Sequence, residues 1–228
     1  MHSKVFVRLM SLTAAGVIVC GLGTAILPSD AQDSAEAGKV YKKRGVALQS
    51  QGQLARAIIE YRKALELNPD DASSHNNLGL AFKDMDLLDD AEAELRAAIE
   101  IKPDEKNYQF NLGIVMLRKS NLRGAEDCFR KAVKLDPNDA ESQFRMAQVL
   151  MMQGRSDDGE RFVRQAVSLK PRDPQYLQLL GDILLREIRA ESALSAYRKA
   201  RELSPKPNVV LNNKIEYVTH LVTARTVQ

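Results

Sequence analysis

Apolar residues recur at helical spacing along most of this 228-residue chain. From residue 38 onward, segments of roughly 14 residues carry apolar side chains at a period near 3.6, as an amphipathic α-helix does. A proline follows every second segment, and proline ends a helix because it lacks the backbone N–H that the next turn requires. The pattern therefore predicts an all-α protein built from pairs of short helices.

The helical pairs repeat every 34 residues. Small residues hold three fixed places in the repeat, where larger side chains would keep the two helices of a pair apart. The register is defined by Pro69, Pro103, Pro137, Pro171 and Pro205; by Gly45, Gly79, Gly113, Ala147 and Gly181; by Ala57, Ala91, Ala125, Gly159 and Ala193; and by Ala64, Ala98, Ala132, Ala166 and Ala200. Glycine and alanine exchange places in the fourth repeat. Because Gly159 costs about 1 kcal/mol relative to alanine inside a helix, we expect that repeat to be the least stable.

This pattern resembles that of the tetratricopeptide-repeat family. The first helix of a repeat (helix A) contains Leu-Gly-x2-aromatic, as in Leu78-Gly79 with Phe82. The second (helix B) contains Ala-x3-aromatic-x2-Ala, as in Ala57, Tyr61 and Ala64. The resemblance implies a right-handed α-solenoid of five helix-turn-helix repeats, at 38–71, 72–105, 106–139, 140–173 and 174–207.

Turns and helix starts carry their own signals. Gly52 and Gly154 fall at the turn between two helices, where a left-handed residue is favourable. Asp71, Asp139 and Asp173 precede a helix, where a side-chain oxygen can accept a hydrogen bond from a first-turn N–H.

Both ends of the array differ from the repeats. Residues 208–228 are predicted to form a C-terminal capping helix and tail, whose apolar stripe covers the last repeat. The stripe consists of Leu211, Ile215, Val218 and Val222. An alternative is that this helix is a second contact surface for a partner. Residues 32–37 are small and acidic, and they predict a short flexible linker.

Residues 1–31 are predicted to be a signal peptide or membrane anchor. Two basic residues precede the uncharged stretch Leu9–Leu27, and Pro28–Ala31 ends in the small-x-small pattern of a cleavage site. Left uncut, such a stretch can span a membrane, and Cys20 is an alternative site of lipidation. All three alternatives predict export to the bacterial periplasm or envelope membrane. Membrane contact is then expected only through residues 1–31, if they are uncleaved or lipidated.

Family geometry assigns positions 2, 5, 9, 12 and 13 of each repeat to a concave groove lined by helix A. Apolar residues there predict a site for an apolar helix or extended peptide, although tight packing could instead bury them in part. A second row at position 6 contains asparagines, which can both donate to and accept from a peptide backbone. The predicted partner-binding residues are Asn76, Asn77, Leu80, Phe110, Asn111, Ile114, Leu117, Phe144, Met151 and Met152.

Other kinds of site are not indicated. His2, His75 and His220 lack metal-ligand spacing with cysteine or carboxylate residues, and no phosphate-binding loop or nucleophile motif occurs. We therefore predict no enzyme activity, metal, cofactor or small-molecule substrate. The formal charge of +3, without a basic stripe, argues against nucleic-acid binding. Cys128 is expected to be a small buried apolar residue.

Together these features predict a non-enzymatic scaffold of the bacterial envelope that binds a protein or peptide in its concave groove. By architecture, the chain resembles exported tetratricopeptide-repeat accessory proteins of pili, notably the tight-adherence (Flp) type, or of secretion systems. One alternative is a structural protein that assembles into homo-oligomers. Another is a module that changes the activity of a neighbouring enzyme.

Overall fold

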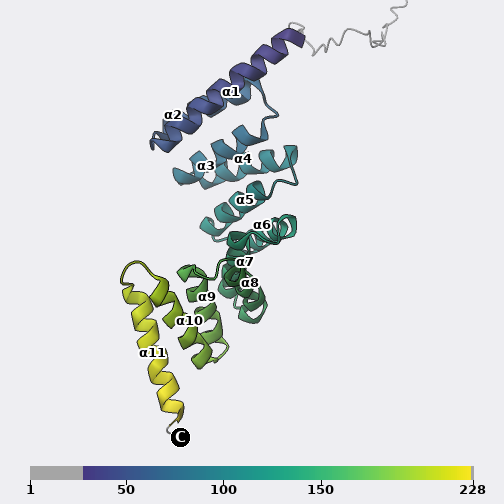
Figure 1. Ribbon diagram of the computed structural model, residues 1–228. Helices are drawn as coiled ribbons and strands as arrows, with labels where there is room; N and C mark the ends of the chain where they lie inside the picture. Colours follow the sequence, from purple (N-terminus) through teal and green to yellow (C-terminus); the bar gives the residue numbers. More distant parts are fainter. Residues whose placement is uncertain (1–27, 227–228) are drawn as a thin grey trace, which may run out of the picture.

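The computed structural model describes residues 28–226. Figure 1 shows paired helices stacked from one end of an elongated molecule to the other, and no strand occurs in this range. The helices are α1 (Pro28–Ser50), α2 (Leu54–Leu67), α3 (Ala72–Asp84), α4 (Leu88–Ile101), α5 (Lys106–Arg118), α6 (Leu122–Leu135), α7 (Ala140–Met152), α8 (Ser156–Leu169), α9 (Pro174–Arg186), α10 (Ala190–Leu203) and α11 (Val209–Thr226). The predicted all-α solenoid is confirmed.

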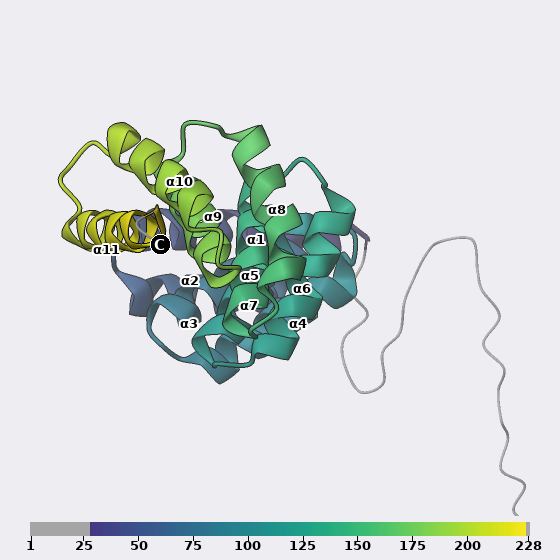
Figure 2. The same ribbon diagram turned by 90° about the horizontal axis from the view of Figure 1, so that it is seen from below.

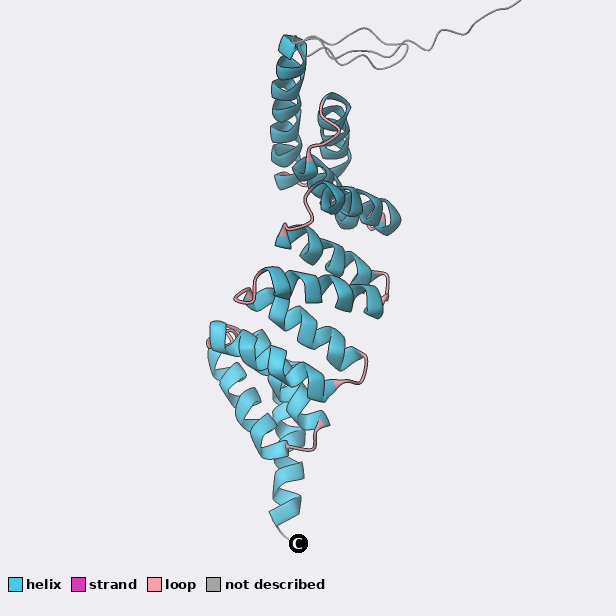
Figure 3. Cartoon of the chain, turned by 90° about the vertical axis from the view of Figure 1, so that its right-hand side faces the viewer, coloured by secondary structure: helices cyan, strands magenta, loops and turns pink. Residues whose placement is uncertain are grey.

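Odd-numbered helices α1 to α9 are the A helices of five repeats, and α2 to α10 are the B helices. Each helix packs against the next one along the chain, and short loops join them (Figure 3). Contacts also join α1 to α3, α3 to α5 and α7 to α9, so the A helices follow one another along one side. Successive pairs are rotated relative to each other, as the view in Figure 2 shows, and this rotation makes the stack a superhelix.

The two helices of a repeat approach so closely that a side chain is excluded at one crossing point. A Cβ atom at Gly113 would lie 2.7 Å from the Phe129 ring, and one at Gly79 would lie 2.8 Å from Leu95 Cγ. Real Cβ contacts are longer than this because interiors are already close-packed. Glycine on helix A therefore sets the spacing within these repeats.

Repeat four keeps the same close approach with the glycine on the other helix. A Cβ atom at Gly159 would lie 3.2 Å from the backbone oxygen of Ala147, and one at Gly79 would lie 3.1 Å from the oxygen of Ala91. The two glycines thus face equivalent backbone atoms across the contact. The methyl group of Ala147 is accommodated because Val163 stands where Phe129 stands one repeat earlier.

The five turns between helices A and B share one backbone conformation. Gly52 and Gly154 have φ angles of 73° and 80°, which confirms the predicted left-handed turns. The other repeats place Asp86, Ser120 and Ile188 at the same position, with φ angles of 64°, 59° and 61°. In every turn the next residue donates a backbone hydrogen bond of 2.9 Å to the carbonyl five residues before it. This bond holds even the β-branched Ile188 in a region that such residues rarely adopt.

Two of the three predicted N-caps are formed as expected. Asp139 and Asp173 each accept a hydrogen bond from a first-turn N–H. Asp71 precedes α3 but makes no such bond, because its carboxylate accepts from Lys42 Nζ (2.8 Å) and Ser74 Oγ (2.7 Å) instead. Burial acts to raise the pKa of Asp71, but these hydrogen bonds outweigh it and the pKa is lowered.

Residues 32–37, predicted as a flexible linker, lie within helix α1. The prediction failed because the alanines and Glu36 of this segment are good helix formers, and this end of α1 packs against α2. Ser34 Oγ donates a hydrogen bond to the carbonyl of Leu67. A Cβ atom at Gly38 would lie 3.3 Å from the carbonyl oxygen of Ala64. The predicted targeting features Leu9–Leu27, including Cys20, lie outside the described residues.

The C-terminal helix α11 covers the last repeat as predicted. Leu211, Ile215 and Val218 are buried against α9 and α10, and Val222 is partly buried beside them. Apolar residues also lie on the outer side of this helix, where the side chain of Tyr217 is 59% exposed. The capping role is therefore confirmed, and the outer side remains uncovered.

Ion pairs join three successive B helices to the repeat that follows each of them. The pairs are Lys119–Glu92 (2.7 Å), Arg155–Glu126 (3.0 Å) and Arg189–Glu160 (2.8 Å). The hydrogen bond from Lys119 is the main reason that the pKa of Glu92 is lowered. Burial acts to raise the pKa of Glu126 and Glu160, but hydrogen bonds from neighbouring side chains outweigh it and lower both values. These partly buried carboxylates therefore favour the folded state when ionised.

We expect acid to weaken the array through these three carboxylates. Because the pKa values are lower in the folded state, their contribution is complete above the unfolded-state pKa of about 4.3 and disappears as the pH falls through the folded values. The urea midpoint should fall between about pH 5 and pH 3. Glu126→Gln should reduce this pH dependence, whereas Glu66→Gln at an exposed position of α2 should not. Equal pH profiles for Glu126→Gln and the wild type would contradict the assignment.

The glycine contacts predict opposite sensitivities in repeats three and four. Gly113→Ala should lower the free energy of unfolding by about 2 kcal/mol, because its Cβ overlaps the Phe129 ring. Gly159→Ala should change it by less than about 1 kcal/mol, since the tight 3.2 Å contact is offset by better helix propensity. Urea denaturation measures both changes. Hydrogen exchange then tests whether repeat four opens first, and equal losses in the two variants would refute the packing argument.

Candidate partner-binding face

The predicted partner-binding residues lie on A helices α3, α5 and α7. These residues, called the helix-A face below, are Asn76, Asn77, Leu80, Phe110, Asn111, Ile114, Leu117, Phe144, Met151 and Met152. They lie in register because helices α3 and α5 contact each other and each repeat adds the same 34 residues. The structure separates them into an accessible group and a buried group.

The accessible group is mostly apolar. Phe110, Ile114 and Leu117 are partly buried and pack with one side against the core of repeats one to four. Met151 packs in the same way against the core of repeats four and five. Met152 is the most open, with 52% of its surface exposed. The core therefore supports these side chains on one side, while part of the surface of each remains available for contact with a partner.

Phe144 belongs to the buried group. Only 7% of its surface is exposed, because its ring stacks on that of Tyr176 with a centroid distance of 4.8 Å. The guanidinium of Arg145 lies 5.2 Å from the centre of the Phe144 ring. A ring between two such neighbours is well placed to join repeats four and five. For Phe144, the packing alternative left open by the sequence describes the structure better than the groove alternative.

The three asparagines form a short chain of hydrogen bonds. Asn111 Nδ2 donates to Asn76 Oδ1 at 2.8 Å, and Asn76 Nδ2 donates to Asn77 Oδ1 at 3.4 Å. Asn76 is buried, whereas Asn77 and Asn111 are partly exposed. The bond between Asn76 and Asn111 joins α3 to α5. The two bonds leave Oδ1 of Asn111 and Nδ2 of Asn77 for other partners.

Two arginines border this face and were not among the predicted residues. Arg118 donates hydrogen bonds to the carbonyl of Lys83 and to Asp86 Oδ1. Arg145 forms an ion pair with Glu141, with an Nε–Oε1 distance of 2.9 Å. Arg145 is at position 6 of its repeat and Arg118 is at position 13. Both positions belong to the rows assigned to the groove, so the register could have identified these two residues. They place positive charge beside the apolar row.

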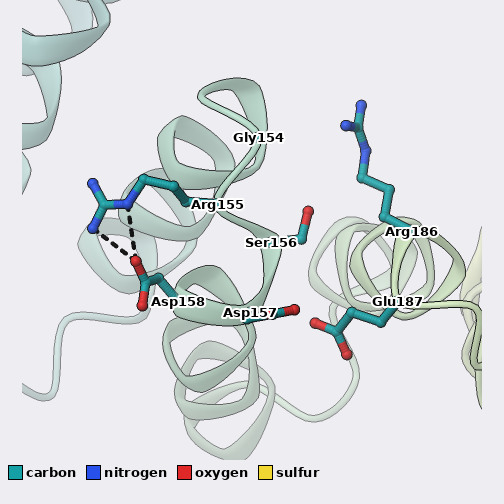
Figure 4. Close-up of a pocket in the computed structure, with 7 residues that line it drawn as sticks. All are labelled: Gly154, Arg155, Ser156, Asp157, Asp158, Arg186 and Glu187. Atoms are coloured by element: carbon teal, nitrogen blue, oxygen red, sulfur yellow. Dashed lines mark hydrogen bonds and ion pairs between the residues drawn. The ribbon is translucent and has the colours of Figure 1, made fainter.

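A separate cavity of about 600 Å³ lies between the α7–α8 turn and the end of α9 (Figure 4). Arg155 pairs with Asp158, while Asp157 and Glu187 point toward each other. Arg155 also contacts Glu126 in the preceding repeat. The cavity is therefore part of the junction between repeats, where Arg155 is paired with both Asp158 and Glu126.

Within residues 28–226, no three His, Cys, Asp or Glu side chains are grouped so that they could hold a metal ion. In the same part of the chain, no helix has the length and apolar character needed to cross a membrane.

Three sequence profiles match overlapping parts of the repeat array. A profile described as TPR repeat matches residues 45–86, and two described as tetratricopeptide repeat match residues 78–140 and 116–183. Together they extend over residues 45–183, which is more than half of the chain. No curated protein matches the chain significantly in sequence.

Several solved structures share the fold at low sequence identity. YrrB, a TPR protein with an unusual peptide-binding site, is 21% identical, with a TM-score of 0.68 over 86% of this chain and 96% of its own. PilF of Pseudomonas aeruginosa is 18% identical, with a TM-score of 0.74 over 85% of this chain and 88% of its own. MamA of Desulfovibrio magneticus RS-1 is 18% identical, with a TM-score of 0.69 over 73% and 94%. At these identities, the likeness establishes the fold.

Proposed function

Because the chain belongs to the tetratricopeptide-repeat family, we propose that it is a protein-interaction scaffold that binds a partner helix or extended peptide on its helix-A face. The same fold carries a peptide-binding site in YrrB. The proposal places the partner across α3, α5 and α7 of this chain.

The observation that carries this proposal is the row of supported but accessible apolar side chains. Ile114, Leu117 and Met151 each pack against the core on one side and keep surface open on the other. Such residues lose little conformational freedom when a partner covers them, which reduces the cost of binding. Methionine adds a flexible apolar surface that adapts to different partners. A partner with apolar side chains along one helical face fits this row.

The polar neighbours of the row support the same kind of partner. Asn77 and Asn111 flank the apolar side chains and keep hydrogen-bonding atoms free. Lys42 on α1 is already held by Asp71 and Ser73 at 2.8 and 2.7 Å, so its ammonium group is paired within the chain. An internal helix or extended segment therefore fits better than a free C-terminal carboxylate.

A crosslinked pull-down with matched variants tests the helix-A face. Leu117→Glu combined with Met152→Glu should abolish capture of the partner from an envelope extract, because each adds a charge to an apolar contact. Ile59→Glu on α2 is the control, since Ile59 and Met152 are both 52% exposed. Circular dichroism verifies equal helical content.

Equal capture by all three proteins would disprove a role for this face. Capture of a second copy of this chain, retained in the helix-A variant, would favour the homo-oligomer instead. The ends of the array support that second candidate, because Val40 on α1 and Val210 on α11 are 45% and 60% exposed.

We further propose that the scaffold acts in the bacterial envelope, as an accessory protein of a pilus or secretion system. The support is the predicted targeting segment at 1–31, together with an array of few repeats. Mass spectrometry of the chain from separated cell fractions should find it in the envelope or periplasm, beginning at Gln32 after cleavage, at a lipidated Cys20, or at the intact N-terminus of an anchor. An intact N-terminus in the cytoplasmic fraction alone would rule out export.

A further inference from the structure

A second cleft lies between α4, α5 and α6, away from the helix-A face. Its volume is about 280 Å³. The floor is apolar, formed by the buried side chains of Leu112, Met116 and Cys128. The rim carries charges of both signs, from Arg96, Lys131, Glu100 and Asp127. A small apolar pocket with a few polar groups is the usual form of a site that holds one side chain or one small ring.

The 34-residue register shows which side chain this cleft lacks. Position 23 of the repeat is Cys128 here, and it is Phe162 in the next repeat. Phe162 packs against the apolar cores on both sides of its own junction. In the preceding repeat the same position is Glu94, which bonds His75 Nδ1 at 2.7 Å. At both neighbouring junctions, the side chain at position 23 of the repeat therefore fills the space. The small side chain of Cys128 instead leaves room for an aromatic ring.

Position 4 of the repeat leads to the same conclusion. His75 and Gln143 occupy this position in the neighbouring repeats, and each bonds the carbonyl of a proline in the repeat before it, at 3.0 and 2.8 Å. The side-chain amide of Gln109 has no hydrogen-bond partner among the described residues, and although only 4% of the residue is exposed, its amide atoms are not fully buried. It lines the cleft. The amide therefore faces the cleft with its hydrogen-bonding atoms accessible, and a ligand with a hydroxyl group can bond to it.

The thiol at the base of the cleft is suited to packing. Burial raises the pKa of Cys128 to about 11, so the group remains a neutral thiol. Gly124 lies beside the sulfur of Met116, since a Cβ atom at Gly124 would be 3.0 Å from Met116 Sδ. The absence of a side chain at this position therefore lets Met116 line the cleft. Cysteine and methionine sulfur atoms both make favourable contacts with aromatic rings.

We propose that this cleft binds the side chain of a tyrosine presented by a partner protein. The ring occupies the space that Phe162 fills one repeat later, against Met116 and Cys128. The phenolic hydroxyl hydrogen-bonds the accessible amide of Gln109, so that the apolar ring and the polar end of a tyrosine each meet a matching part of the cleft. The site is independent of the helix-A face, so a partner can engage one or both.

The test uses model compounds and the full chain. The ¹³C-methyl signal of Met116 is followed by NMR while p-cresol, toluene or N-acetyl-tyrosine methylamide is added. p-Cresol and the tyrosine amide should shift this signal saturably. Toluene should bind about tenfold more weakly, because it has no hydroxyl group that can hydrogen-bond the side-chain amide of Gln109. In Gln109→Leu the difference between p-cresol and toluene should disappear.

Filling the cleft from within supplies the decisive control. Cys128→Phe copies the residue found at position 162 and should abolish the shifts, as should Cys128→Met if the phenylalanine variant fails to fold. Cys128→Ser leaves the cleft open and should retain binding. A missing response in the wild type, or one that persists in a folded Cys128→Phe protein, overturns the proposal. Binding of p-cresol without binding of the tyrosine amide also overturns it, since the cleft would then accept a free phenol but no partner side chain.

Discussion

The close contact between the two helices of each repeat is the constraint on which the rest of this structure depends. Where Gly79 and Gly113 cross helix B, no side chain fits, and the spacing of each pair is set by that exclusion. Repeat four satisfies the same constraint with Gly159 on the opposite helix. The crossing thus requires a glycine, and that glycine can lie on either helix of the pair. Pairs with equal spacing stack regularly, which brings the A helices into one row.

Both candidate surfaces arise from departures within that regular stack. The helix-A face is accessible where Leu117 and Met152 replace polar or charged residues of other repeats, and it closes where Phe144 stacks on Tyr176. The cleft beside α5 exists because Cys128 is smaller than its counterparts in the adjacent repeats. In a repeat array, each repeat contacts only its neighbours. A substitution in one repeat can therefore create a local binding surface while the rest of the stack stays the same.

Much of the fold could be predicted from the sequence because the 34-residue period encodes contacts between neighbours. The buried stripe of α11 followed from helical spacing alone. Sequence reasoning failed where a distant partner decides the outcome: Lys42 diverts the carboxylate of Asp71 from its cap, and Tyr176 buries Phe144. Ile188 shows another limit, since its left-handed backbone is imposed by the turn and contradicts its own propensity. For the candidate site, the register identified the residues but could not separate the exposed ones from the buried ones.

The ion pairs between repeats carry a consequence for how such a chain can change its length. Glu126 in repeat three is held by Arg155 from the turn of repeat four, and the equivalent turn residue of repeat three is Asn121. If repeat three were duplicated in tandem, the first copy would lose Arg155, but Lys119 of the second copy would stand where Lys119 now pairs with Glu92, the counterpart of Glu126 one repeat earlier. The carboxylate therefore keeps a cationic partner, because two different positions of the following repeat can supply it, and a whole repeat can be added without leaving this charge unpaired.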